Sequence, residues 1–202
     1  MDDFLVEMEK FARQNKIPVV LPETRMFLEE LCKKEQPKQI LEIGMAIGFS
    51  GSVMLKSCDA FLTTCEASLP NIEIAKRNFA LQNLTKRVKI VEGDCIKTLP
   101  TLNGQKFDLV FLDGPKGLYL EILKLVLPLL SSNGTLVADN VLFRGMVSGK
   151  NKISENRFKT TVAVLKEFND YLTHNKNFDA QILDIGDGLC VARFKKENRN
   201  EV

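Results

Sequence analysis

Residues 40–50 read Ile-Leu-Glu-Ile-Gly-Met-Ala-Ile-Gly-Phe-Ser, and the rest of the predicted fold is arranged around them. A short apolar run leads into two glycines four residues apart, and a small polar residue and a helical pattern follow. The run is typical of a buried parallel strand, and the glycines predict a tight turn into a helix. In an open α/β sheet, ligands bind where such strands end. We therefore expect polar residues at the strand ends to form the functional site.

Strand and helix patterns alternate outward from this stretch. Two helices are expected first, over residues 3–14 and from Pro22. Strands are predicted at 39–44, 61–66, 88–93, 107–113 and 135–139, with helices to 57 and over 70–82, 117–130 and 157–172. A final hairpin is predicted from 178–185 and 189–194 around Gly-Asp-Gly. The expected fold is α/β, a seven-stranded mostly parallel sheet with an antiparallel C-terminal strand and helices on both faces.

Length and composition are typical of one ordinary globular domain, residues 1–202. Within it we expect N-terminal helices (1–37), a cofactor-binding core (38–140) and a substrate-side helix and hairpin (141–202). No apolar run approaches the ~20 residues of a membrane span, and the acidic start is unlike a signal peptide. The five cysteines include no Cys-x-x-Cys pair, which argues against zinc and predicts reduced thiols in a cytoplasmic protein.

The strand ends carry groups suited to a nucleoside. Gly44 and Gly48 match neither the G-x-G-x-x-G fingerprint nor a P-loop, and a simple packing turn would explain them as well. Glu66 closes a strand about 20 residues beyond the glycine turn, where an acid can accept both hydroxyl protons of a ribose; a solvated or capping glutamate is the alternative. Asp94 is placed to read a base edge or to cap the next short helix.

Oxygen-bearing side chains follow the next two strands. Asp113 ends one, and Asp139 and Asn140 end its expected neighbour. Two carboxylates and an amide without a nearby His or Cys suit a hard cation, Mg²⁺ or Ca²⁺, although each residue has a local alternative as a turn or polar strand end. Lys116 would lose its proton more readily beside a dication and could act as a base; a solvated surface lysine is the alternative.

The remaining charged features lie later in the chain. His174, the only histidine, is expected at the surface after a helix. Residues 144–166 form a basic segment that contains a single acid, Glu155. Its six cations are Arg144, Lys150, Lys152, Arg157, Lys159 and Lys166. It favours an anionic substrate or a phosphate backbone, although such runs are commonly solvated faces and only Phe143 and Phe158 interleave with it.

These motifs together resemble the cation-dependent O-methyltransferases that use S-adenosylmethionine, of the catechol and caffeoyl-CoA type, over about residues 4–195. Residues 41–50 look like the cofactor loop, and residues 107–116 and 138–145 look like the two metal motifs. The resemblance implies a Rossmann-like methyltransferase fold and a homodimer. It implies cofactor contacts from Val20, Glu42, Gly44, Ser50, Glu66, Gly93, Asp94, Cys95 and Asp113. It also implies a metal held by Asp113, Asp139 and Asn140, with Lys116 as the catalytic base beside Asp113.

Residues 139–147, the basic segment and residues 185–188 look similar to the bacterial tRNA 5-hydroxyuridine methyltransferases, which make 5-methoxyuridine at the wobble position. This similarity implies a tRNA anticodon stem-loop as partner, contacted by Arg144, Lys150, Lys152 and Arg157. Two alternatives stay open, a small-molecule catechol or caffeoyl-CoA-like O-methyltransferase and a non-catalytic binding protein. One departure from many relatives is Gly114-Pro115, which would reshape the loop that presents Lys116.

Overall fold

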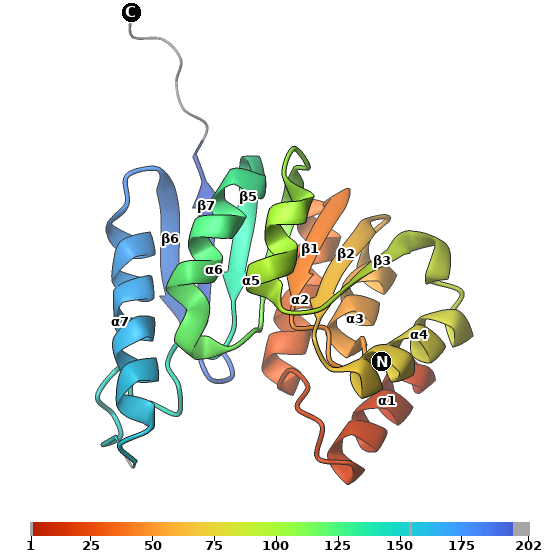
Figure 1. The fold of residues 1–202 in the computed structure, drawn as a ribbon, viewed down its shortest axis with the longest axis horizontal. Coiled ribbons are helices and arrows are strands. Elements are labelled where there is room, and N and C mark those ends of the chain that lie inside the picture. Colours follow the sequence, from red (N-terminus) through yellow and green to blue (C-terminus); the bar gives the residue numbers. More distant parts are fainter. Residues whose placement is uncertain (1, 154, 196–202) are drawn as a thin grey trace, which may run out of the picture. The chain divides into compact units, whose positions relative to one another are not determined.

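The computed structural model describes residues 2–153 and 155–195 (Figure 1). The chain forms two compact units, Met1–Leu102 and Asn103–Val202, and each is described by itself below. The single-domain organisation therefore stays a prediction. Its outermost residues, 1 and 196–202, and residue 154 of the expected loop lie outside the described residues.

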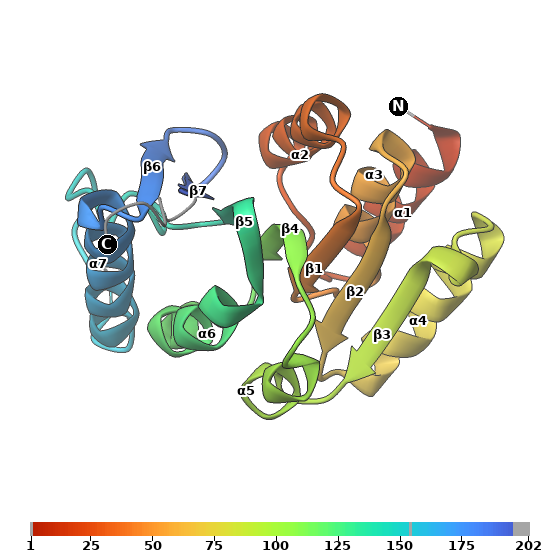
Figure 2. The same cartoon turned by 90° about the horizontal axis from the view of Figure 1, so that it is seen from above.

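Within the described ranges, seven strands follow the order β3-β2-β1-β4-β5-β7-β6. Strand β7 runs antiparallel to β5 and to β6, whereas β1 with β2, β2 with β3 and β4 with β5 pair in parallel. Helices lie on both sides of the strands (Figure 2). The predicted α/β fold class, with its antiparallel C-terminal strand, is confirmed.

The first unit begins with two helices and then alternates strands and helices. In chain order it contains α1 (Asp3–Gln14), α2 (Pro22–Glu35), β1 (Gln39–Ile43), α3 (Phe49–Ser57), β2 (Phe61–Glu66), α4 (Leu69–Leu81), η1 (Thr85–Arg87), β3 (Val88–Glu92), α5 (Cys95–Thr98) and η2 (Leu99–Leu102), where η marks a 3₁₀ turn.

Local chemistry explains these elements. The Asp2 carboxylate caps α1 by accepting the N–H of Phe4 at 2.9 Å. Four of the five residues of β1 are buried, as expected for a parallel strand covered on both faces. Gly48 adopts φ +80°, and a Cβ there would lie 2.7 Å from the Phe79 ring, so glycine is required both by the backbone and by the packing of α4.

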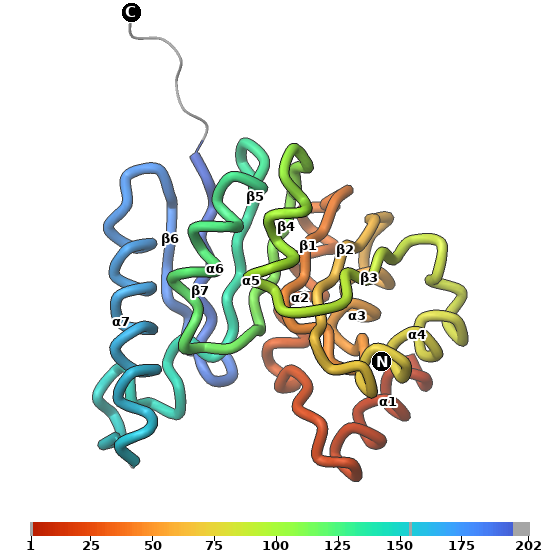
Figure 3. The backbone as a smooth tube through the Cα atoms, in the orientation of Figure 1, coloured from red at the N-terminus to blue at the C-terminus, as the bar shows by residue number. Residues whose placement is uncertain are grey.

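The second unit contains β4 (Phe107–Leu112), η3 (Lys116–Leu118), α6 (Tyr119–Val126), η4 (Leu127–Leu129), β5 (Leu130–Ala138), α7 (Phe158–His174), β6 (Phe178–Leu183) and β7 (Leu189–Phe194). Between β5 and α7 the chain forms a long loop over the part that the structure describes (Figure 3). The Tyr119 and Phe168 rings pack edge to face, 5.2 Å apart, and join α6 to α7.

The boundary between α6 and β5 differs from the prediction. The helix was expected to reach Leu130 and the strand to start at Thr135, but α6 ends at Val126 and β5 already begins at Leu130. Leu130 pairs with Phe107, and the register shifts before Leu109 pairs with Thr135. The irregular pairing explains the error, because the polar residues 131–134 interrupt the apolar pattern that marks a strand.

The cysteines and the histidine agree with expectation. All five cysteines are free thiols, four of them buried and Cys95 partly exposed. His174 lies at the surface and pairs with Asp170 at 3.0 Å. Across the described ranges, no helix is long and apolar enough to cross a membrane.

Candidate active site

The glycine loop of the first unit is tied to the end of β2. The N–H groups of Gly44 and Met45 donate to the Cys65 carbonyl at 3.1 and 3.2 Å. Ala46 adopts φ +46°, which is rare for a residue with a side chain, and its N–H donates to Glu66 Oε2 at 2.8 Å. Glu66 thus holds the loop that follows β1 in a strained conformation.

The Glu66 carboxylate also organises its own turn. Its Oε1 accepts the N–H groups of Ala67 and Ser68 at 2.9 and 2.8 Å. A carboxylate offers about four acceptor positions, so Oε2, with one bond to Ala46, retains capacity for a further donor. Gly93 lies alongside, since its N–H donates to the Glu66 carbonyl at 2.8 Å. This edge therefore fits the hydroxyl groups of a ribose.

Glu42 is wholly buried behind the glycine loop. Its two carboxylate oxygens accept the Ser50 and Thr64 hydroxyls, each at 2.6 Å. A Cβ at Gly51 would lie 2.7 Å from Leu62 Cδ2 and 3.2 Å from Glu42 Oε2, so the glycine leaves room for both side chains. Glu42 therefore orients Ser50, and direct contact of either residue with a cofactor stays a prediction.

The other predicted cofactor residues occupy the same unit. Val20 is buried in the extended connection between α1 and α2. Asp94 caps α5 by accepting the Ile96 N–H at 2.9 Å, the local alternative that the sequence left open. Cys95, the first residue of α5, is partly exposed. Contacts of these residues with adenine stay predictions.

In the second unit, Asp113 and Asp139 follow paired strands. Leu112 and Ala138 are partners in the parallel ladder, and the Asp139 N–H donates to the Leu112 carbonyl at 3.0 Å. The fully buried Tyr119 hydroxyl lies 3.1 Å from the Leu112 carbonyl and 2.9 Å from the Asp139 carbonyl. Tyr119 therefore fixes the two strand ends relative to each other.

The two carboxylates repel each other. Burial raises the pKa of Asp113, although the neighbouring Lys116 ammonium opposes this rise. Burial, and then the Asp113 charge, raise the pKa of Asp139 to about 7. An added positive charge would relieve this cost. The two carboxylates and the neighbouring Asn140 amide have the oxygen ligands that a hard cation prefers, so these residues are suited to bind such a cation. In residues 2–153 and 155–195, no group of three or more His, Cys, Asp and Glu side chains forms a ligand cluster.

Lys116 and Asn140 complete this acidic site. Lys116 Nζ lies 2.6 Å from Asp113 Oδ1, so Gly114-Pro115 does not stop the lysine from reaching the carboxylate. Asn140 adopts φ +57°, and its N–H donates to Asp139 Oδ1 at 2.7 Å. A cation at Asp113 would compete with Lys116 for the same oxygen.

Asp187 is a residue that sequence reasoning missed. It lies in the β6–β7 turn, accepts the Arg144 N–H and contributes to the raised pKa of Asp139. The sequence marked it by the Asp-Gly turn signal and within residues 185–188, which look similar to the tRNA 5-hydroxyuridine methyltransferases, and neither signal gave Asp187 a role of its own. Asp187 therefore joins the acidic site to the start of the basic segment.

Some of the residues predicted to contact tRNA form ion pairs with acids within the described residues, and the others do not. Lys150 and Arg157 pair with the exposed acids Asp184 and Glu155. Within the described part of the basic segment, no ion pair involves Arg144, Lys152, Lys159 or Lys166, and all four are exposed. The segment therefore carries an uncompensated positive charge.

These features define an α/β protein with a ribose-compatible strand edge in one unit and an acidic, lysine-bearing site in the other. Residues 2–195 match the model of the O-methyltransferase family, so the chain belongs to that family. It is 31% identical over 206 residues to a catechol O-methyltransferase of Niastella koreensis, covering 96% of this chain and 91% of that protein. It is 23% identical over 193 residues to a caffeoyl-CoA O-methyltransferase of Populus kitakamiensis, covering 92% and 81%.

A solved structure supports the same assignment. The SAH-bound methyltransferase PaMTH1 of Podospora anserina has a TM-score of 0.87 and 28% identity, covering 97% of this chain and 89% of that one. The predicted family is thus confirmed, and the chain is a methyltransferase. Its closeness to the tRNA 5-hydroxyuridine enzymes stays a prediction.

The raised pKa of Asp139 predicts a pH-dependent stability. Between pH 3.8, the ordinary pKa of an aspartate, and about pH 7, the raised pKa of Asp139, the folded state holds a proton on Asp139 that the unfolded state has released. The free energy of unfolding therefore falls as pH rises through this window, by at most about 1.4 kcal/mol per pH unit. Urea unfolding with EDTA at several pH values measures this slope. Asp139→Asn should flatten it, and an equal slope in the variant would contradict the assignment.

Proposed function

We propose that this chain is an S-adenosylmethionine-dependent O-methyltransferase that methylates 5-hydroxyuridine at the wobble position of tRNA, giving 5-methoxyuridine. The observation that supports an RNA substrate is the basic segment that follows Asp139 and Asn140, because it is exposed and carries positive charge that no acid neutralises within the described residues. Phosphate backbones bind such segments by releasing counterions. The proposal includes a cytoplasmic homodimer and Mg²⁺ as the divalent cation.

The first unit would hold the methyl donor. Glu66 would accept the ribose hydroxyl protons, with Gly44, Gly93, Asp94 and Cys95 around the nucleoside. Ser50, oriented by Glu42, would lie toward the methionine part. When bound, the sulfonium supplies an electrophilic methyl group and the cation acts as a Lewis acid that acidifies the substrate hydroxyl.

The second unit would hold the acceptor hydroxyl. Asp113, Asp139 and Asn140 would bind the cation. Lys116 would take the proton from the substrate oxygen at Nζ. Lys116 would keep the proton as an ammonium while that oxygen receives the methyl group of the bound cofactor with loss of the carbon–sulfur bond. Tyr119 keeps the two strand ends at a constant separation, so positioning supplies much of the acceleration.

A second candidate is methylation of a small catechol. The 31% identical Niastella koreensis relative, a catechol O-methyltransferase, favours it. This candidate predicts turnover of catechols by the purified enzyme with Mg²⁺. It also predicts that reversing the charges of Lys150 and Lys152 leaves turnover unchanged.

Mass spectrometry of wobble nucleosides from cells lacking the gene tests the proposal. We expect 5-hydroxyuridine to accumulate and 5-methoxyuridine to disappear. The wild-type gene should restore the modification, and an Asp139→Ala gene should not. Unchanged nucleosides, together with catechol turnover in vitro, would assign the enzyme to the second candidate.

A further inference from the structure

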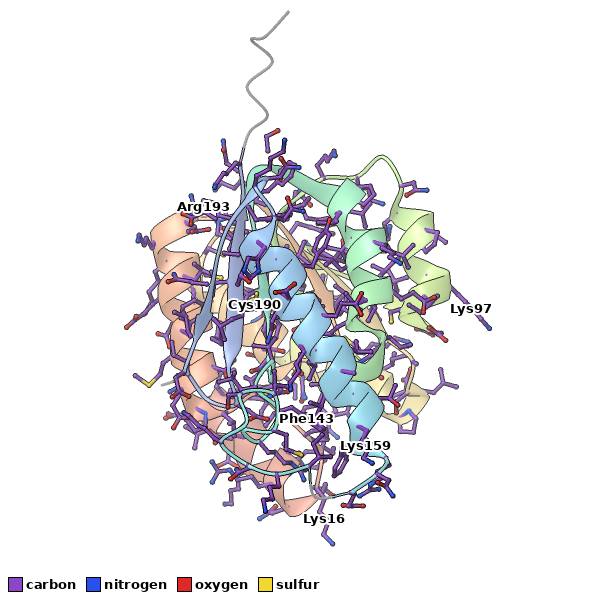
Figure 4. The ribbon with its side chains drawn as sticks, turned by 90° about the vertical axis from the view of Figure 1, so that its left-hand side faces the viewer. Lys16, Lys97, Phe143, Lys159, Cys190 and Arg193 are labelled. Atoms are coloured by element: carbon purple, nitrogen blue, oxygen red, sulfur yellow. The ribbon has the colours of Figure 1, made fainter. Side chains whose placement is uncertain are left out.

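Two arginines of the basic segment lie over one aromatic ring. The Arg157 guanidinium carbon lies 4.8 Å from the centroid of the Phe158 ring, and that of Arg144 lies 5.9 Å away. Phe143 packs edge to face against the same ring at 5.5 Å. Figure 4 shows Phe143 beside the first turn of α7, where Lys159 is labelled. We call Arg144, Arg157 and Phe158 the arginine clamp.

The clamp offers hydrogen-bond donors to solvent. Both arginines are exposed and Phe158 is half-buried. A guanidinium over an aromatic face keeps its N–H groups at its edge, where they can match two oxygens of one phosphate. Arg157 shares its charge with Glu155 in an exposed ion pair, which is weak and displaceable. Within the described segments, no ion pair involves Arg144.

The loop that carries the clamp has a constrained backbone. Phe143 and Arg144 are consecutive residues with φ +45° and +56°, a conformation that side chains rarely adopt. The Met146 N–H donates to the Phe143 carbonyl at 3.0 Å, and Asn151 Nδ2 donates to the Arg144 carbonyl at 2.8 Å. Asp187 accepts the Arg144 N–H. These bonds hold Arg144 over Phe158 before any ligand arrives.

We propose that Arg144 and Arg157 jointly bind one backbone phosphate of the RNA, and that Phe158 is the positioning residue that holds both guanidiniums. This inference rests on the proposed function and deepens it. It also predicts that the two arginines contribute more to RNA binding than Lys150 and Lys152. Lys150 forms an ion pair with Asp184, and Lys152 makes no aromatic contact within the described residues. The phosphates of a CoA ester share this chemistry, and the experiment separates the two sources.

Fluorescence anisotropy of a labelled anticodon stem-loop over a series of salt concentrations tests the clamp. Arg144→Gln and Arg157→Gln should each weaken binding about 3- to 10-fold and reduce the salt slope by roughly one. Phe158→Leu, which removes no charge, should weaken binding by a similar factor and raise KM more than it lowers kcat. Phe158→Tyr, which keeps the ring, should restore affinity. Lys124→Gln on α6 removes the same charge from an exposed site outside the clamp and should change affinity less than twofold.

Each result decides one point. If the wild-type enzyme binds and methylates the stem-loop, and the clamp variants match it in affinity and salt slope, the clamp is wrong and the proposed function stands. If the wild-type enzyme neither binds nor methylates the stem-loop, the proposed function fails and RNA is excluded as the ligand. Wild-type turnover of a catechol-bearing acyl-CoA ester, with KM raised in Arg157→Gln, would overturn RNA as the source of the phosphate.

Discussion

Asp139→Ala is expected to reduce the kcat of methyl transfer by about 10³-fold or more. The variant removes one of two carboxylates that would hold the cation, and loss of Lewis-acid assistance costs several kcal/mol of transition-state stabilisation, or about 10³-fold. The protein should still fold, because the side chain that is lost is a buried acid whose charge is disfavoured by burial and by Asp113. Steady-state kinetics with added Mg²⁺ measure the effect.

The matched control is Asp170→Ala. Asp170 lies on α7 in the same unit, is 74% exposed and, within residues 2–153 and 155–195, forms an ion pair with His174 alone. This variant should keep full activity, while Asp139→Ala should still bind S-adenosylhomocysteine. Full kcat in Asp139→Ala would rule out the cation mechanism and with it the assigned role of the acidic site.

Glu66→Ala is expected to weaken S-adenosylhomocysteine binding by about 30- to 100-fold. Hydrogen bonds to a charged acceptor contribute about 1.5–3 kcal/mol each, and Glu66 would accept them from the ribose. The change also releases the Ala46 N–H, so the glycine loop loses its brace. Isothermal titration calorimetry measures the dissociation constant.

Glu92→Ala provides the control for Glu66. Glu92 is the β3 partner of Glu66 in the parallel ladder, and its carboxylate makes an exposed ion pair with Lys76. We expect its loss to leave affinity unchanged. Glu66→Gln keeps an oxygen for the backbone donors, so it should preserve stability while still losing at least about tenfold in affinity. Wild-type affinity in both Glu66 variants would place the nucleoside elsewhere.

The strand cores were predictable because apolar and β-branched residues, which favour strands, make up most of each of them. Strand β2 was predicted with its observed bounds, and β1, β3 and β4 differ from prediction by their last residue. The start of β5 was not predictable, since Ser131, Ser132 and Asn133 hide a strand that pairs irregularly with β4. Such a segment owes its conformation to its neighbour rather than to its own pattern.

The site was predictable only as a set of residue types at strand ends. Asp113, Lys116 and Asp139 do gather in the second unit, because paired parallel strands deliver their ends to one edge. For Asp94 the sequence offered two roles, and the structure shows the cap. Side-chain partners at long sequence separation decide such questions, and a single sequence does not contain them.

The order of strands and helices along the chain, the strand-end residues and the family could be predicted without coordinates, because hydrophobic periodicity and short motifs are local properties. How those residues are held became visible in the folded chain. The tertiary structure buries Glu42 against Ser50 and Thr64, bridges Leu112 and Asp139 through Tyr119, and sets Asp187 beside the basic segment. These arrangements depend on which distant backbone groups need a partner when buried, and that requirement arises only when the chain has folded.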